Sequence, residues 1–385
     1  MKVSVIFGTR PEAIKLAPVL IRLRNIRGVQ CSVCVTGQHR EMLDQVLDVF
    51  RITPDHDLNI MRPDQSLSDL TARLLKSLSA YMKQERPDIV IVQGDTTTAF
   101  VGALAAFYNN IPVAHVEAGL RTGNLRSPWP EEANRILVSR LAEFHFAPTN
   151  VSRDNLLKEG IPAKKIFVTG NTVIDALKFI AKKVRISSPS IPGSIRNAIT
   201  KRNGGGFVLI TGHRRENFGR GLSSICKAII VLADKFPDVQ FIYAIHLNPN
   251  VRRVVLEFLG SKRIGKSQKN VHLIEPVPYP SFVFLMDRCR MVLTDSGGIQ
   301  EEAPSLGKPV LIMRDTTERS EVIRVGAAKL IGTNENVIVR EVSRLLTDEK
   351  TYSEMSCAHN LYGNGDASKK ILAILLKKYP VRKPC

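Results

Sequence analysis

Short apolar runs alternate with longer amphipathic stretches along the whole chain. The runs suit buried strands, whereas stretches such as Leu67 to Gln84 repeat apolar residues with the period of about 3.6 that is typical of a helix. Strand-like runs occupy residues 3–7, 29–35, 89–92, 111–116, 144–149 and 166–171, then 207–211, 241–245, 271–274, 291–294 and 309–313. Such alternation predicts an α/β fold with parallel, doubly wound sheets.

The chain of 385 residues is long enough for two domains of ordinary size. A basic, turn-rich region from Lys182 to Gly206 separates the two α/β halves. We place the linker between Thr169 and Gly206, with the break near Gly170. The prediction is a Rossmann-like domain at residues 1–169 and a second at 170–365, with a cleft between their strand ends.

Composition indicates a globular protein, with 44% hydrophobic and 24% charged residues. No apolar run approaches the roughly 18 residues that a membrane span needs, and the first run is too short for a signal peptide. We therefore expect a cytoplasmic protein. Cys31 and Cys34 fall on a predicted strand, where residues three apart face opposite ways, so they are not expected to form a chelating or redox pair.

The formal net charge of +19 suggests an anionic ligand, nucleic acid or a membrane surface. Denser basic patches lie at residues 182–202 and 369–383, and few aromatic residues accompany them, so no nucleic-acid partner is expected. The second patch falls on a predicted helix at 367–379. We interpret it as a helix packed by its apolar face with its lysines in solvent, and weak association with an anionic membrane surface is the alternative.

Three carboxylates follow predicted strand ends or open a helix between Ile89 and Arg135. Asp95 and Glu117 each follow a strand, and Glu131 opens the next helix. Ligands bind at the carboxyl ends of the strands of an open parallel sheet, so we expect this stretch to carry the chemistry. Simpler explanations exist: Asp95 fits a helix N-cap, and Glu131 with Arg135 fits a surface ion pair at i, i+4 spacing.

Other residues are suited to binding phosphate. Ser296, Gly297 and Gly298 follow a predicted strand and open a helix, where free N–H groups bind phosphate; an ordinary capped helix start is the alternative. Glu302 lies about one turn later and could accept hydrogen bonds from ribose. Arg10 and Lys15 could meet a diphosphate across the cleft, although Lys15 also fits a solvated helix position. His213 stands at a strand end, where it could donate to a phosphate or act as a base.

Several common sites are not indicated. Gly8-Thr9-Arg10 matches neither the G-x-G-x-x-G pattern nor the P-loop, which argues against a dinucleotide and against ATP. No Cys/His or His/carboxylate spacing indicates a metal, and no nucleophile motif such as G-x-S-x-G occurs. We expect neither a metal nor a cofactor.

Motifs spread over nearly the whole chain resemble those of the non-hydrolysing UDP-N-acetylglucosamine 2-epimerase family. They are Gly8-Thr9-Arg10-Pro11-Glu12-Ala13-Ile14-Lys15, Gln38-His39-Arg40-Glu41-Met42-Leu43, Gly94-Asp95-Thr96-Thr97-Thr98, His115-Val116-Glu117-Ala118-Gly119-Leu120-Arg121, Pro130-Glu131-Glu132-Ala133-Asn134-Arg135, Gly212-His213-Arg214-Arg215-Glu216 and Asp295-Ser296-Gly297-Gly298-Ile299-Gln300-Glu301-Glu302. The resemblance implies a glycosyltransferase-B-like fold, in which the final helix at 366–385 joins the first domain.

The resemblance further implies reversible epimerisation of UDP-N-acetylglucosamine to UDP-N-acetylmannosamine. UDP would leave by anti elimination to a 2-acetamidoglucal and add back after C2 is reprotonated on its other face. Asp95, Glu117 and Glu131 are then candidate acid/base groups. Arg10, Lys15, His213 and the turn 296–298 are suited to stabilising the departing diphosphate.

Substrate contacts and partners are also implied. By likeness Phe282 would contact uracil, Val277 would do so through its main chain, Glu302 would bind ribose, and Arg319 would bind the sugar or its phosphate; Arg135 is a further substrate-binding candidate. The family also implies a homodimer and a role in bacterial surface polysaccharide synthesis (O-antigen and lipopolysaccharide). Some relatives have an activating second substrate site, whose counterpart in this chain would lie near Gln38 to Glu41 and Arg214-Arg215. Leu361 and Asn364 depart from the usual motif before the last helix.

Three alternatives stay open. The first is a glycosyltransferase of the same fold, and the second is a hydrolysing 2-epimerase that releases free N-acetylmannosamine. The third, from another class, is a basic protein that binds polyanions or membranes and has retained the fold.

Overall fold

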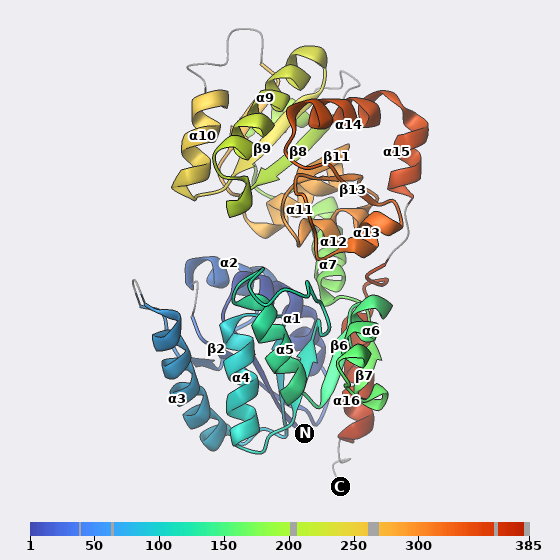
Figure 1. The fold of residues 1–385 in the computed structure, drawn as a ribbon. Coiled ribbons are helices and arrows are strands. Elements are labelled where there is room, and N and C mark those ends of the chain that lie inside the picture. The colour runs from blue at the N-terminus through green and yellow to red at the C-terminus, as the bar shows by residue number, and fades with distance from the viewer. Residues whose placement is uncertain (38–39, 63–64, 201–205, 261–268, 358–360, 381–385) are drawn as a thin grey trace. The chain divides into compact units, whose positions relative to one another are not determined.

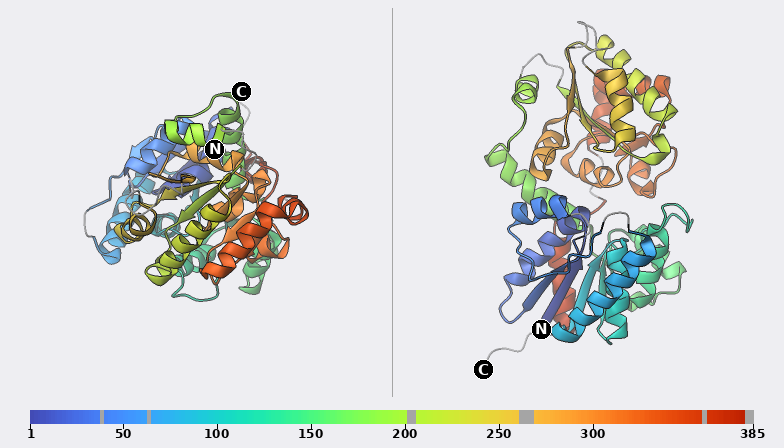
Figure 2. Two further views of the ribbon diagram at one scale, coloured as in Figure 1. Left: turned by 90° about the horizontal axis from the view of Figure 1, so that it is seen from above. Right: turned by 90° about the vertical axis from the view of Figure 1, so that its left-hand side faces the viewer.

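The computed structural model describes residues 1–37, 40–62, 65–200, 206–260, 269–357 and 361–380. Its contacts divide the chain into two compact units, one made of Met1–Lys178 with Tyr362–Cys385 and the other of Phe179–Leu361. Each unit contains a parallel sheet covered by helices (Figures 1 and 2). The predicted α/β, doubly wound fold class is therefore confirmed, and each unit is described below by itself.

The first unit is built on a 7-stranded sheet in the order β3-β2-β1-β4-β5-β6-β7. Every neighbouring pair is parallel, and Val5 of β1 is in register with Val33 of β2 and Ile91 of β4. Since β1, β4 and β5 are adjacent, the loops after their carboxyl ends lie side by side. The strands are β1 (Lys2–Phe7), β2 (Gln30–Val35), β3 (His56–Asp57), β4 (Ile89–Gln93), β5 (Val113–Val116), β6 (Phe144–Ala147) and β7 (Ile166–Val168).

Helices cover both faces of this sheet (Figure 1). Helices α3, α4 and α5 pack on the face that carries Ile6, Val90 and Val92, and all three strand residues are fully buried. Helix α1 packs against α2 and the C-terminal helix α16. The helices are α1 (Arg10–Arg24), α2 (Arg40–Phe50), α3 (Leu67–Glu85), α4 (Thr97–Tyr108), α5 (Glu131–Leu141), α6 (Asn150–Lys158), the 3-10 turn η1 (Ala163–Lys165), α7 (Thr172–Ile186) and α16 (Ala367–Lys378).

The second unit is built on a 6-stranded parallel sheet in the order β10-β9-β8-β11-β12-β13. Helices α9, α10 and α14 cover one face, where Ile210 and Tyr243 form part of the core. The strands are β8 (Phe207–Gly212), β9 (Gln240–Ile245), β10 (Val271–Ile274), β11 (Met291–Thr294), β12 (Val310–Ile312) and β13 (Ala328–Leu330). The helices are α8 (Gly193–Thr200), η2 (Arg215–Asn217), α9 (Arg220–Lys235), α10 (Pro249–Leu259), α11 (Tyr279–Arg288), α12 (Ile299–Glu302), η3 (Pro304–Leu306), α13 (Ser320–Arg324), α14 (Glu335–Thr347) and α15 (Glu349–Ser356).

The connection between the units differs from the predicted linker. Helix α7 runs without interruption from Thr172 to Ile186, and the two units divide within it, after Lys178, rather than near Gly170. The region taken as linker also contains α8. Its buried residues Ile191, Ile195 and Ala198 recur at helical spacing, but the surrounding Pro, Ser and basic residues hide this short pattern.

The C-terminal helix belongs to the first unit, as the resemblance implied, with the return to that unit at Tyr362. Asp175 of α7 accepts hydrogen bonds from the Ala367 and Ser368 amides at 3.1 and 2.9 Å, which caps the start of α16. Ile371 and Leu375 are buried while Lys369 and Lys370 are exposed, so the packed-helix interpretation is confirmed. In the described part of the chain no helix has the length and apolar character needed to span a membrane.

Candidate functional site

Glu117 begins the turn after β5, and its backbone adopts a conformation that non-glycine residues rarely show, with φ +65°. Its Oε2 atom accepts hydrogen bonds from Lys15 Nζ at 2.5 Å and from Gln93 Nε2 at 2.6 Å. The Glu117 side chain is 4% exposed, so this carboxylate is buried against a cation. Lys15 is 12% exposed and ion-paired, which makes the alternative of a solvated helix position wrong.

Asp95 follows β4 and is bound by the guanidinium of Arg135 from α5. Arg135 Nε and Nη2 lie 2.8 and 2.6 Å from Asp95 Oδ2, and Nη1 lies 2.8 Å from Glu132 Oε2. Burial lowers the pKa of Arg135, but the two carboxylates outweigh it and raise that pKa overall. The i, i+4 surface pair between Glu131 and Arg135 is therefore wrong, because Arg135 turns inward to Asp95 and Glu132.

Helix α4 is capped by Thr96 and not by Asp95. Thr96 has an extended backbone, and its hydroxyl accepts from the Ala99 amide at 3.0 Å. The carboxylate of Asp95 is instead left 27% exposed and oriented by Arg135. The N-cap alternative for Asp95 is therefore wrong, and its side chain remains available for a ligand.

Glu131 is the first residue of α5, and its environment differs from that of the other two carboxylates. Its Oε2 atom is buried and has no hydrogen-bond partner among the residues that the structure describes. A buried polar atom without a partner is costly and calls for an explanation such as a ligand or a catalytic role. Glu131 therefore has an unsatisfied oxygen at the start of α5, the same helix that carries Arg135, the partner of Asp95.

Glu12 was not singled out from the sequence, yet it joins two turns of the site. Its carboxylate is 1% exposed and accepts from the Gly8 and Thr9 amides at 3.0 and 2.8 Å and from the Thr96 hydroxyl at 2.7 Å. Burial raises the pKa of Glu12, and these hydrogen bonds oppose that rise. The Thr9-to-Glu12 spacing is that of a capping box, a signal that could have identified this residue. Glu12 holds the turn that carries Arg10, a partly exposed residue, next to the turn that carries Asp95.

His115 was also missed, and it contacts the turn that carries Asp95. Its Nε2 atom lies 2.8 Å from the Gly94 carbonyl, while Nδ1 is buried without a partner among the described residues. Burial lowers the pKa of His115 to about 3. His115 is therefore neutral at physiological pH and donates from Nε2.

In the second unit the turns after β8 and β11 lie side by side, because Thr211 and Thr294 are in register and their hydroxyls are 2.6 Å apart. His213 follows β8 and Asp295 follows β11. His213 Nδ1 lies 3.2 Å from Asp295 Oδ1, and the His213 ring stacks on that of His246 with centroids 5.1 Å apart. The His213 side chain is 35% exposed, so part of its ring is open to a ligand.

The turn of Ser296, Gly297 and Gly298 is shaped by Arg319. A Cβ atom on Gly297 would lie 2.6 Å from Arg319 Nη1, whereas one on Gly298 would meet nothing within 4 Å. Arg319 is itself held by Glu301 at 2.5 Å and Glu318 at 2.6 Å. The resemblance implied that Arg319 binds the sugar or its phosphate, and in the structure its guanidinium lies beside Gly297 and is paired with two carboxylates.

Glu302 and Phe282 lie on neighbouring elements of the second unit. Glu302 Oε1 accepts from Tyr279 Oη at 2.6 Å, and both residues are buried. Tyr279 begins α11, which also carries the partly exposed Phe282, and Val277 lies in the loop just before it. Tyr279 was missed because nothing in its local sequence indicates a partner 23 residues away.

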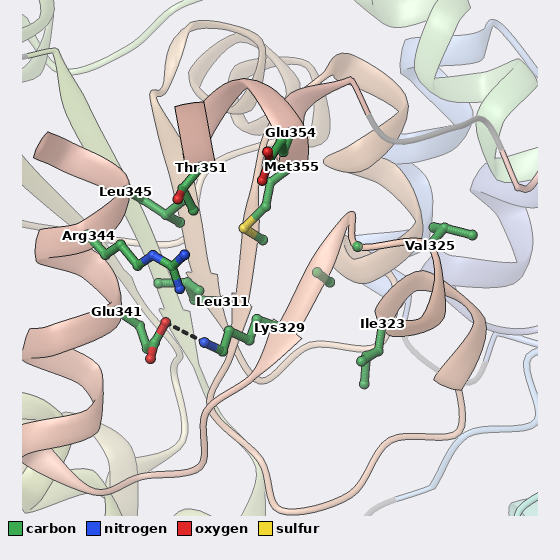
Figure 3. A pocket seen from close by; sticks show the side chains of 12 residues that line it. Leu311, Ile323, Val325, Lys329, Glu341, Arg344, Leu345, Thr351, Glu354 and Met355 are labelled. Atoms are coloured by element: carbon green, nitrogen blue, oxygen red, sulfur yellow. Dashed lines mark hydrogen bonds and ion pairs between the residues drawn. The ribbon is translucent and has the colours of Figure 1, made fainter. Parts of the chain in front are cut away.

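A cavity of about 400 Å³ lies elsewhere in the second unit, at the β13 edge of the sheet, and Figure 3 draws the side chains that line it. It is lined by residues of β12, β13, α14 and α15, among them Lys329 and Glu341, which form an ion pair at 2.6 Å. None of the candidate residues lines it.

Among the described residues there is also no group of three or more His, Cys, Asp or Glu that could hold a metal ion. Of the activating site that some relatives have, the part near Gln38 to Glu41 lies outside the residues whose side chains are described.

Comparisons with known proteins cover nearly the whole chain. The profile of a family described as UDP-N-acetylglucosamine 2-epimerase matches residues 21–376. A UDP-N-acetylglucosamine 2-epimerase of Yersinia pestis is 54% identical over 97% of this chain and 98% of its own, and one of Escherichia coli K12 is 53% identical over the same shares.

Solved structures agree with the sequence comparisons. A crystal structure of the Neisseria meningitidis UDP-GlcNAc 2-epimerase bound to UDP-GlcNAc has a TM-score of 0.89 and 50% identity, covering 98% of this chain and 100% of that one. The Methanocaldococcus jannaschii UDP-GlcNAc 2-epimerase in complex with UDP-GlcNAc and UDP has a TM-score of 0.81 and 34% identity, with the same coverage. This chain therefore belongs to the UDP-N-acetylglucosamine 2-epimerase family of isomerases.

Proposed function

We propose that this enzyme interconverts UDP-N-acetylglucosamine and UDP-N-acetylmannosamine without hydrolysis, through a 2-acetamidoglucal intermediate. The observation that carries the proposal is the arrangement of three carboxylates around the ends of adjacent strands. Asp95 and Glu117 each have their own cation, Arg135 and Lys15, while Glu131 presents a buried oxygen that has no partner among the described residues. Groups held in such different environments can serve different proton transfers.

The reaction divides into two balanced steps. In the first, a carboxylate removes the proton from C2 while the C1–O bond breaks; the C1=C2 double bond forms and the electron pair leaves on UDP. In the second, another acid delivers a proton to the opposite face of C2, and a phosphate oxygen of UDP bonds again to C1. The C2 hydrogen is weakly acidic, so stabilisation of the departing diphosphate must lead. No electrons are gained or lost overall, and no redox partner is needed.

We assign the sugar chemistry to the first unit and the nucleotide to the second. Lys15 and Arg10, near the β1 end, suit a developing negative charge on the diphosphate. In the second unit His213 and the turn 296–298 suit phosphate, and Arg319 packs against that turn at Gly297. Glu302 is oriented by Tyr279 for ribose hydroxyls. The remaining contacts, with uracil at Phe282 and at the Val277 main chain, follow the family resemblance.

The test is incubation with UDP-N-acetylglucosamine in deuterated water, followed by NMR of the sugar. We expect UDP-N-acetylmannosamine carrying deuterium at C2. Release of free N-acetylmannosamine would instead favour the hydrolysing reaction, and no turnover until an acceptor is added would favour a transferase.

The intermediate needs its own test, because deuterium exchange alone does not show C1–O cleavage. Substrate with ¹⁸O in the bridge between C1 and phosphorus should lose the label from the bridge to the other oxygens of the same phosphate during turnover. Label that stays in the bridge while C2 epimerises would contradict elimination. A homodimer and a supply of product to bacterial surface polysaccharides, both implied by the resemblance, stay predictions.

A further inference from the structure

Asp295 is a buried carboxylate for which the proposed chemistry has no direct use. It follows β11 in the second unit, is 1% exposed, and lies next to the turn that carries His213. A buried ionised carboxylate is retained only when several donors compensate its lost hydration. The donors around Asp295 therefore identify the groups that it holds.

Within the described part of the chain, the donors to Asp295 come from the turn after β8 and from η2, which follows it. Oδ2 accepts from the His213 and Arg214 amides, both at 2.9 Å, and from Asn217 Nδ2 at 3.0 Å. Oδ1 faces the imidazole, with His213 Nδ1 at 3.2 Å. Burial raises the pKa of Asp295, but the His213 ring and these backbone donors lower it overall, so the carboxylate is ionised at neutral pH.

An ionised carboxylate can only accept hydrogen bonds, which decides the tautomer of its neighbour. Nδ1 of His213 must carry a proton to face Oδ1. The other ring nitrogen, Nε2, is then an acceptor when the ring is neutral and a donor when it is protonated. Since Nδ1 faces Asp295 and 35% of the side chain is exposed, Nε2 is the ring nitrogen left for a ligand.

The remaining groups around His213 do not replace this role. His246 stacks on the ring, and burial together with the proximity of His213 lowers the pKa of His246. Arg214, the next residue in the chain, carries a positive charge and not a negative one. The nearby phenol of Tyr243 is fully buried, and burial raises its pKa well above the ordinary value, so it is neutral. Among these neighbours Asp295 alone supplies a negative charge to the imidazole.

We infer that Asp295 is a positioning residue that holds the Nδ1–H of His213 and so directs Nε2, which carries a hydrogen only in the protonated ring, at the departing diphosphate. The inference rests on the proposed function, which assigns the diphosphate to His213. In the forward step a protonated His213 donates from Nε2 to a phosphate oxygen of UDP as the C1–O bond breaks. In the return step the same hydrogen bond is released as the oxygen bonds to C1 again.

The tautomer can be read directly from the unaltered protein. Nitrogen-15 NMR of the imidazoles, with the His213 signals assigned by their loss in His213→Gln, should show the neutral ring protonated on Nδ1. Free imidazole side chains favour the proton on Nε2, so the expected result is not the default. A His213 ring protonated on Nε2 would overturn the inference. Since this measurement needs no substrate, it is independent of whether the epimerase proposal holds.

Kinetics provide the second readout, as a double-mutant comparison. Asp295→Asn should lower kcat by about 10- to 100-fold, the usual effect of removing a group that orients a functional histidine. In the His213→Gln background the same change should lower kcat by less than about 3-fold, because the residue it acts through is gone. Equal losses in both backgrounds would indicate a structural role alone and overturn the inference. Asp238→Asn, at an exposed residue of the same unit, is the matched control and should leave kcat unchanged.

The inference can still be tested if Asp295→Asn does not fold. Asp295 also accepts two backbone amides, and an asparagine can replace only part of that set. If the variant does not fold, the tautomer of the unaltered protein still decides. If the unaltered protein does not epimerise its substrate, the proposed function fails while the tautomer result stands.

Discussion

Lys15 Nζ and Glu117 Oε2 lie 2.5 Å apart, although the two residues are separated by 102 positions in the chain. The pair is buried, with 12% and 4% of the side chains exposed. A buried charge that loses its partner is strongly destabilising, because the remaining charge has neither water nor a counter-ion. The cation of α1 and the carboxylate after β5 therefore form one electrostatic unit.

Lys15→Met should lower the free energy of unfolding by about 3 kcal/mol, the usual cost of breaking a buried pair. The double variant Lys15→Met with Glu117→Gln should regain most of this loss, since no uncompensated charge is left. Urea denaturation followed by circular dichroism measures both. Strictly additive losses in the double variant would show that the two side chains do not act as a pair.

Arg135→Lys should lower kcat by about 10- to 100-fold while substrate still binds. Arg135 uses Nε and Nη2 on Asp95 and Nη1 on Glu132 at once, and a lysine ammonium cannot hold both carboxylates in that geometry. Arg140→Lys, at an exposed position of the same helix, is the control and should leave kcat unchanged. If Arg135→Lys retains full kcat, the orientation of Asp95 by Arg135 has no part in turnover.

The buried His115 should make the stability of the folded protein sensitive to acid. Its pKa falls from about 6.5 in the unfolded chain to about 3 in the folded protein, chiefly through burial. Between these values the unfolded chain binds one proton more, so this contribution to stability is complete above pH about 6.5 and is lost as the pH falls. The slope of unfolding free energy against pH should therefore be smaller in His115→Gln by up to about 1.4 kcal/mol per pH unit. Parallel curves for the two proteins would contradict the assignment.

The placement of the strand-end residues could be predicted because it depends on local patterns. Asp95 and Glu117 follow β4 and β5 as the apolar runs indicated, and His213 and Ser296 follow β8 and β11. A parallel sheet brings such positions to one edge without further information. Their roles in catalysis and binding stay predictions.

The partners of these residues could not be predicted, because tertiary packing selects them. Arg135 had a carboxylate at i−4 by spacing, yet it binds Asp95 forty positions away in sequence and Glu132 at i−3. The donors to Asp295 come from a different strand end. The division of the units within α7 was equally hidden, since a helix that leaves one unit and enters the other shows no change in its own periodicity.

Gly297 and Gly298 offer a test of the phosphate turn with a built-in control, because they are neighbours with opposite surroundings. A Cβ on Gly297 would lie 2.6 Å from Arg319 Nη1 and 3.0 Å from Cζ, and Arg319 cannot retreat freely because Glu301 and Glu318 hold it. Burial alone would raise the pKa of Glu318, but the Arg319 and Arg314 guanidiniums lower it to about 2, which shows how strong these ion pairs are.

Gly297→Ala must therefore displace the turn itself and should weaken UDP binding by about 10-fold and cost about 2 kcal/mol of stability. Gly298→Ala meets nothing within 4 Å and should retain both properties. Calorimetric titration with UDP and urea denaturation of the two variants decide the matter, and equal affinities would show that the shape of this turn does not govern nucleotide binding.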